Sequence, residues 1–124
     1  MTDHRPVFLD LWRIRLPISG LVSILHRVSG VLMVFAIPVF TLLFALALEG
    51  PDGFGSAAAI VAHPLGKLGL LILGWAMLHH FFSGLRYLVI DLGIGVDKPV
   101  ARRTAWGVLS TGLALTVIGG GWLL

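Results

Sequence analysis

Three long apolar stretches, at residues 21–48, 66–92 and 104–124, dominate this chain of 124 residues. An α-helix needs about 20 apolar residues to cross a hydrocarbon layer about 30 Å thick. A lipid-exposed strand is excluded because its unpaired backbone amides would find no partner in hydrocarbon. We therefore predict an all-α integral membrane protein with one spanning helix in each stretch.

The composition supports this class. Hydrophobic residues make up 57% of the chain and charged residues only 12%, whereas a soluble domain has about 25% charged residues. The chain contains no cysteine, which excludes disulfides, thiolate metal sites, iron–sulfur ligation and covalent haem attachment through cysteine. Any metal or cofactor must then be held by histidine, carboxylate or methionine.

The basic residues predict an orientation in the membrane. They gather before the first stretch and around the second loop: Arg5, Arg13, Arg15, Arg27, Arg86, Lys98, Arg102 and Arg103. The first loop has Lys67 alone. The positive-inside rule therefore places residues 1–20 and the second loop in the cytoplasm, with residues 21–124 as the membrane anchor. The expected location is a bacterial cytoplasmic membrane, ahead of a mitochondrial inner membrane, and no nucleic-acid partner is expected.

A first polar cluster lies at the start of the first stretch. Ser23, His26, Arg27 and Gly30 are three or four residues apart, so they share one helical face. Arg27 alone could simply extend its charge to the lipid headgroups. This explanation does not account for His26 next to Arg27, nor for the hydroxyl of Ser23 one turn before His26 and Gly30 one turn after it. The cluster therefore predicts a bound anionic or polar ligand.

A second polar cluster lies deep in the second stretch. His80 precedes Asp91 by eleven residues, which is about 16 Å along a helix and near mid-membrane. His80, Gly84, Tyr87 and Asp91 form one stripe, and Gly84 leaves space for a flat group against the helix. Histidine is the commonest axial ligand of haem, so the stripe predicts a haem site.

Two alternatives to ligation by His80 stay open. A buried histidine can instead hydrogen-bond to a neighbouring helix, and His79, about 100° further round the helix, is a competing ligand. Arg86 is available for a haem propionate. A second axial histidine is missing, because residues 104–124 contain none and His26 is expected at the wrong depth to face His80. The second ligand is therefore expected from a partner subunit.

Four segments of the sequence carry a family resemblance. They are Arg5-Pro6-Val7-Phe8-Leu9-Asp10, Ile14-Arg15-Leu16-Pro17, Ser23-Ile24-Leu25-His26-Arg27-Val28-Ser29-Gly30 and His80-x-x-x-Gly84-Leu85-Arg86-x-x-x-x-Asp91. In order and spacing they resemble the larger membrane-anchor subunits, of the cytochrome b556 type, of succinate dehydrogenase, respiratory complex II. The resemblance covers nearly the whole chain.

The resemblance implies a role for each candidate residue. His80 matches the axial ligand of haem b, and His26, helped by Arg86, matches a position near the propionates. Ser23 and Arg27 match residues of the ubiquinone pocket. Tyr87 departs from the family, since many relatives have histidine there, and it implies altered propionate or quinone surroundings.

The resemblance also implies partners. A second small anchor subunit would supply the other axial histidine and pack with this chain into a helical bundle. A flavoprotein and an iron–sulfur protein would face residues 1–20. Succinate would be oxidised on the flavoprotein, so no catalysis is expected from this chain alone. Two rival functions remain: an anchor of fumarate reductase that works with menaquinone, and a haem-free membrane scaffold.

Overall fold

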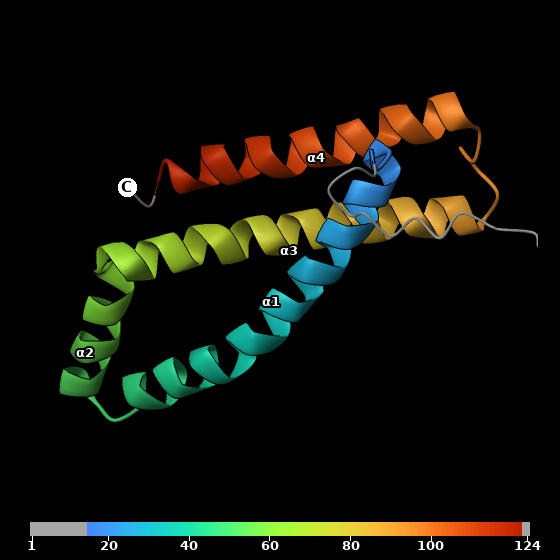
Figure 1. Cartoon of the computed structure of the whole chain (residues 1–124). Coiled ribbons are helices and arrows are strands. Elements are labelled where there is room, and N and C mark those ends of the chain that lie inside the picture. The colour runs from blue at the N-terminus through green and yellow to red at the C-terminus, as the bar shows by residue number, and fades with distance from the viewer. Residues whose placement is uncertain (1–14, 123–124) are drawn as a thin grey trace, which may run out of the picture.

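The computed structural model describes residues 15–122 and contains four helices in this range. They are α1 (Ile18–Ala47), α2 (Pro51–Ala62), α3 (Pro64–Asp91) and α4 (Lys98–Gly120), as Figure 1 shows. No strand occurs among the described residues. The predicted all-α class is confirmed.

The structure has one helix more than the three predicted, because α2 forms in the first loop, between the first two apolar stretches. Pro51 occupies the first turn of α2, where its missing N–H is not needed, and Asp52 adds a favourable negative charge there. The helix ends at His63, whose extended backbone (ψ 144°) is the conformation that the following Pro64 favours. His63 then starts α3, where its Nδ1 accepts a hydrogen bond from the backbone N–H of Leu65 at 3.2 Å.

Two of the four helices, α1 and α3, are long and apolar enough to cross a membrane. The 23 residues of α4 have the required length, but its first turns carry Arg102 and Arg103, and serine, threonine and glycine recur further along. These residues lower the mean hydropathy of α4, so the third predicted span, at 104–124, is less apolar than the other two. Residues 1–14, with most of the predicted cytoplasmic segment, and residues 123–124 lie outside the described range.

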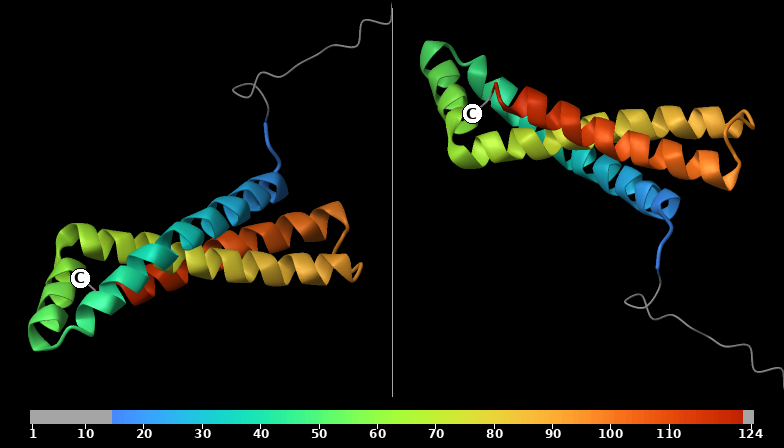
Figure 2. Two further views of the ribbon diagram at one scale, coloured as in Figure 1. Left: turned by 90° about the horizontal axis from the view of Figure 1, so that it is seen from below. Right: turned by 90° about the horizontal axis from the view of Figure 1, so that it is seen from above.

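The helices form an open bundle (Figures 1 and 2). α3 and α4 lie alongside each other, and the first half of α1 crosses α3 near the middle of α3. α2 lies across the far end and joins α1 to α3. The turn between α3 and α4 contains Gly93 and Gly95, both with a positive φ (77° and 74°) that glycine adopts without strain.

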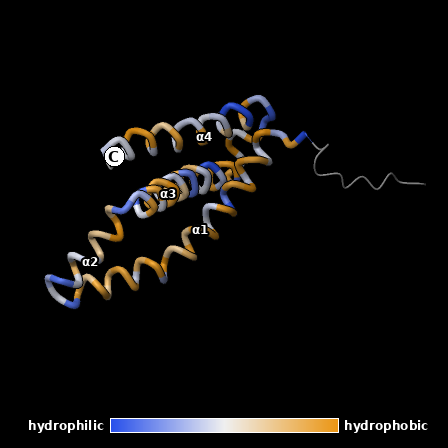
Figure 3. Tube along the Cα trace, turned by 60° about the vertical axis from the view of Figure 1, so that its left-hand side comes forward, coloured by the Kyte–Doolittle hydropathy of each residue, from blue (hydrophilic) through white to orange (hydrophobic). Residues whose placement is uncertain are grey.

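Burial in this bundle is the reverse of that in a soluble domain. Large apolar side chains point outward, and Leu42 for example is 71% exposed. Figure 3 shows the hydrophobic colour along most of α1. The buried residues are small or polar: Val22, Ala57, Ala76 and Ala105, together with Ser29, His79, Ser83 and Arg86. Lipid or partner helices would cover the apolar exterior, as expected for a membrane protein.

Small residues bring α3 and α4 together. On α4, Ala105, Gly112 and Gly120 are buried, and a side chain built on Gly112 would lie 3.6 Å from the Cα of His79. Glycine and alanine at such contacts let membrane helices approach closely. The contact fixes which face of α3 is turned to α4.

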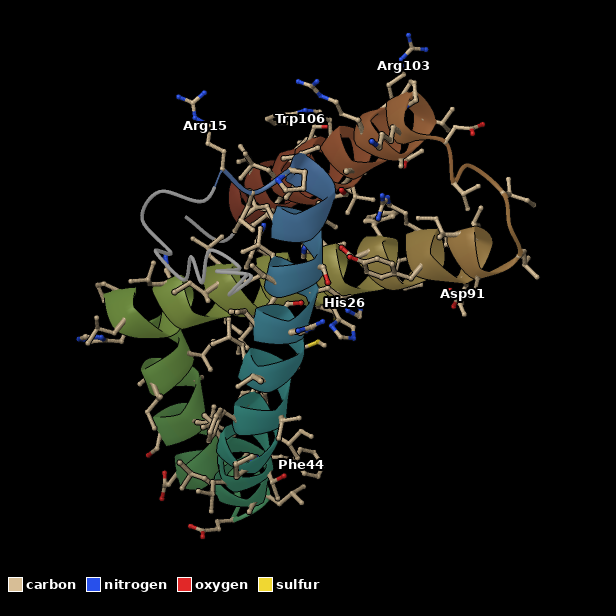
Figure 4. The ribbon with its side chains drawn as sticks, turned by 45° about the vertical axis from the view of Figure 1, so that its right-hand side comes forward. Arg15, His26, Phe44, Asp91, Arg103 and Trp106 are labelled. Carbon is tan, nitrogen blue, oxygen red and sulfur yellow. The ribbon has the colours of Figure 1, made fainter. Side chains whose placement is uncertain are left out.

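The basic side chains gather at the end of the bundle where α1 and α4 begin. Figure 4 shows Arg15, Arg103 and Trp106 at this end and Phe44 at the opposite one. The segment Leu16 to Ser19 lines a cavity of about 810 Å³ together with Lys98 and Arg102, so the two helix starts are neighbours.

Candidate functional site

His26 of α1 and His80 of α3 lie in direct contact. Their ring centroids are 4.0 Å apart and the ring planes differ by 15°, so the two imidazoles are stacked. Figure 4 shows His26 projecting from α1 where that helix crosses α3. The expectation that His26 lies at the wrong depth to face His80 is therefore wrong, because the first turns of α1 cross α3 well before α3 ends.

The ring of His80 is held on α1 through one nitrogen. Its Nδ1 lies 3.1 Å from the carbonyl oxygen of His26 and 3.2 Å from Oγ of Ser29. A side chain on Gly30 would lie 3.1 Å from Cε1 of His80, so the absence of one lets the ring rest against α1. The Nε2 of His80 has no hydrogen-bond partner within residues 15–122. His80 can thus present Nε2 to a metal.

Gly84 and Tyr87 complete the surroundings of His26. A side chain on Gly84 would lie 3.6 Å from Nε2 of His26, so the histidine occupies part of the space that the glycine leaves free. The ring of Tyr87 meets that of His26 edge-on, with centroids 5.3 Å apart. The hydroxyl of Tyr87 is buried and has no hydrogen-bond partner in the described chain. A buried hydroxyl of this kind calls for a polar group from outside the chain.

His79 lies on a different face of α3 from His80, turned to α4, and is fully buried. Its Nε2 is 3.1 Å from Oγ of the equally buried Ser83, and its ring stacks on Trp75 with centroids 5.2 Å apart. Its Nδ1 is buried and has no hydrogen-bond partner among residues 15–122. An enclosed ring with this packing leaves little room for a bulky cofactor.

Arg86 shares the buried face of His79 and is only 8% exposed. Its Nε donates to Oγ1 of Thr104 at 3.0 Å, and its Nη2 donates to the carbonyl oxygen of Ala101 at 3.0 Å. Both acceptors are on α4. The structure therefore separates Arg86 from the His26–His80 pair, although its Cζ lies 5.5 Å from the ring centre of Tyr87.

On α1, Ser23 lies one turn before His26 and Arg27 directly follows it, and neither side chain hydrogen-bonds to His80. Ser23 is half-buried and Arg27 is exposed. No hydrogen bond joins either side chain to another residue in the described part of the chain. Of the six predicted site residues, His26, His80 and Tyr87 are together, whereas Ser23 and Arg27 lie beside them and Arg86 is on another face.

Comparison with known proteins decides the family. A family model described as "Succinate dehydrogenase/Fumarate reductase transmembrane subunit" matches residues 1–119. The chain belongs to this family. A succinate dehydrogenase cytochrome b556 subunit from Coxiella burnetii is 32% identical, over 99% of both chains. A subunit of the same name from Paracoccus denitrificans is 30% identical over 93% of this chain and 88% of its own. A cytochrome b560 subunit from Reclinomonas americana is 26% identical over the whole of this chain.

Membership in the succinate dehydrogenase/fumarate reductase transmembrane subunit family makes this chain a membrane-anchor subunit, in agreement with the resemblance found in the sequence. Among residues 15–122, no three His, Asp or Glu side chains gather into a metal-binding group. Nε2 of His80 has no hydrogen-bond partner among these residues, and neither has the enclosed Nδ1 of His79.

Two residues at the centre of this site were not singled out from the sequence, namely Ser29 and Gly30 as contacts of His80. Both follow His26 by three or four residues, so both lie on its helical face. That spacing was visible in the Ser-x-x-His-Arg-x-Ser-Gly segment. The spacing does not show which residue contacts this face, because His80 lies on another helix, more than fifty residues further along the chain.

Proposed function

We propose that this chain is the haem-binding anchor of succinate dehydrogenase, with His80 as its axial ligand and with Ser23 and Arg27 at a ubiquinone site. The observation that carries the proposal is the hydrogen bond between Nδ1 of His80 and the backbone carbonyl of His26. Metal-binding histidines nearly always donate their other ring N–H to a carbonyl or carboxylate. This arrangement leaves Nε2 of His80 for iron.

The residues around His80 fit haem b. His80 lies well inside α3, and the unpartnered hydroxyl of Tyr87 could donate a hydrogen bond to a polar edge of the group. When bound, haem b accepts and passes on single electrons. The enclosed ring of His79, with its Nε2 at Ser83, supports His80 over His79 as the ligand.

One ligand from this chain supports the expectation of a partner anchor subunit. Axial ligands approach iron end-on from opposite faces of the porphyrin. His26 lies flat on His80 at 4.0 Å, so the two rings cannot do this for one iron. No histidine occurs in α4. The predicted exclusion of His26 as second ligand is kept, although for a different reason, and its role near a propionate stays a prediction. The same holds for Arg86, whose hydrogen bonds to α4 do not favour that role.

The orientation that we propose follows the charges. The end that carries Arg15, Lys98, Arg102 and Arg103 would face the cytoplasm, with α4 as a third span beside α3. The iron–sulfur and flavoprotein subunits would dock at this end. Ser23, one turn of α1 nearer to this end than His26, and Arg27, next to His26, would then lie in the half of the anchor that faces these subunits.

Arg27→Gln is expected to lower succinate-driven quinone reduction about 100-fold. The guanidinium is exposed and has no hydrogen-bond partner among residues 15–122, so it could stabilise the negative charge that develops on a quinone oxygen. The assay compares quinone reduction with reduction of an artificial dye by the soluble subunits, which should not change. Arg102→Gln, an exposed cation at the same end, is the matched control. Equal activity of the two variants would remove Arg27 from the quinone site.

Gentle purification of a tagged chain from its native membrane tests the function as a whole. We expect a second small anchor, an iron–sulfur subunit and a flavoprotein to co-purify, with a b-type absorption band and ubiquinone reduction driven by succinate. A preference for menaquinone would favour the fumarate reductase type of anchor. A colourless chain that purifies alone would favour the haem-free scaffold.

A further inference from the structure

Ser29 is fully buried on α1, between the two histidines of the site. Its Oγ lies 2.8 Å from the carbonyl oxygen of His26 and 3.2 Å from Nδ1 of His80. The same carbonyl is 3.1 Å from that Nδ1, so the three groups form a closed triangle. In a membrane interior such a network matters, because an unsatisfied buried polar group is costly.

The number of protons in the triangle determines the tautomer of His80. A serine hydroxyl has one proton, and Ser29 donates it to the His26 carbonyl. That carbonyl can only accept. Nδ1 of His80 therefore faces two acceptors, and the favourable arrangement puts the ring proton on Nδ1 and the lone pair on Nε2. The opposite tautomer would set the Nδ1 lone pair against the carbonyl oxygen.

We propose that Ser29 is a positioning residue that fixes the Nδ1–H tautomer and the ring orientation of His80 before haem binds. The inference rests on the proposed role of His80 as haem ligand and deepens it. If the His26 carbonyl were the only acceptor, the His80 ring could rotate about that single hydrogen bond. With Ser29 as a second acceptor, and with the ring of His26 stacked on one side at 4.0 Å, the direction of Nε2 is fixed.

The chain contains a matched control in Ser83. Like Ser29 it is fully buried, and its hydroxyl lies at a similar distance, 3.1 Å, from a ring nitrogen of a histidine. That histidine is His79, on the face of α3 turned to α4. Ser83→Ala therefore removes an equivalent buried hydroxyl from the same bundle without touching His80.

The experiment compares Ser29→Ala and Ser83→Ala in the complete complex, purified from membranes. Haem content per flavin, the dissociation constant for haem after its removal and the haem midpoint potential are measured. Ser29→Ala is expected to weaken haem binding about 10- to 100-fold, the usual effect of losing a partner of a metal-binding histidine, and to shift the potential. Ser83→Ala is expected to leave both unchanged.

Three results would overturn the inference. Haem affinity and potential of Ser29→Ala equal to those of the native complex would show that Ser29 does not position His80, and the proposed function would stand. Equal changes in both variants would reduce Ser29 to general packing. A native complex without haem would remove the proposed function and the inference together.

If Ser29→Ala fails to assemble, Ser29→Cys replaces it, because the thiol is similar in size to the hydroxyl and is only a weak acceptor. Unchanged haem affinity of Ser29→Cys would overturn the inference, and weaker haem affinity would support it.

Discussion

Gly30→Val is expected to lower the haem affinity of the complex about tenfold or more while the helices stay folded. Even the first carbon of a side chain at this position would lie 3.1 Å from Cε1 of His80, closer than the 3.5–4.0 Å at which carbon atoms pack well. The two further methyl groups of valine must push the imidazole away from α1. This motion breaks the contacts of Nδ1 with Ser29 and the His26 carbonyl.

The measurement is haem content and affinity of the purified complex, with Gly74→Val as control. The first carbon of a side chain at Gly74 on α3 would meet no atom of the described residues within 4 Å, so the same chemical change there should leave His80 in place. Gly30→Ala should have an intermediate effect, because only one carbon is added. Native haem affinity in Gly30→Val would contradict the packing of His80 against α1.

Arg86→Glu is expected to prevent assembly of α3 with α4. The guanidinium is 8% exposed and donates to Thr104 and to the Ala101 carbonyl. A carboxylate in its place can only accept, so it would face the carbonyl oxygen without a proton to share. A buried polar group left without a partner costs about 1–3 kcal/mol, and more when it is charged. Because 1.4 kcal/mol is a factor of about ten, the equilibrium constant for assembly of the two helices should fall roughly 100-fold.

Arg86→Lys separates charge from geometry. Lysine keeps the cation but lacks the planar group that reaches two acceptors at once, so a milder loss of thermal stability is expected. Arg102→Glu, a charge reversal at an exposed position of α4, should leave stability nearly unchanged. Both stability and amount of complex in the membrane are measured. Normal assembly of Arg86→Glu would mean that the hydrogen bonds to α4 do not hold the two helices together.

The sequence was sufficient to predict the class of fold and its two strongest membrane helices. Long apolar runs at the positions of α1 and α3 leave few alternatives to helix in a membrane. It was not sufficient for α2, whose helix depends on Pro51 in the first turn and a run of alanines in a segment of mixed polarity. Local signals of this kind are weak until neighbouring helices fix the ends of the segment.

The site was predicted in part. Helical spacing correctly placed His80, Gly84 and Tyr87 on one face of α3, and His26 meets that face. The same reasoning failed for the depth of His26, because counting residues from each helix end assumes parallel helices and α1 crosses α3. Helical spacing also could not show that Arg86 donates its hydrogen bonds to α4, because these contacts depend on how each helix is rotated about its own axis.

The reduced-minus-oxidised optical spectrum of the complete complex, recorded for the native chain, His80→Ala and His79→Ala, tests the central claim most directly. Ligation through Nε2 of His80 predicts a b-type α-band in the native complex that is lost or shifted in His80→Ala. The band should persist in His79→Ala, because His79 is enclosed between helices with Ser83 at its Nε2. An unchanged band in His80→Ala, or a band lost only in His79→Ala, would contradict the assignment of the haem ligand.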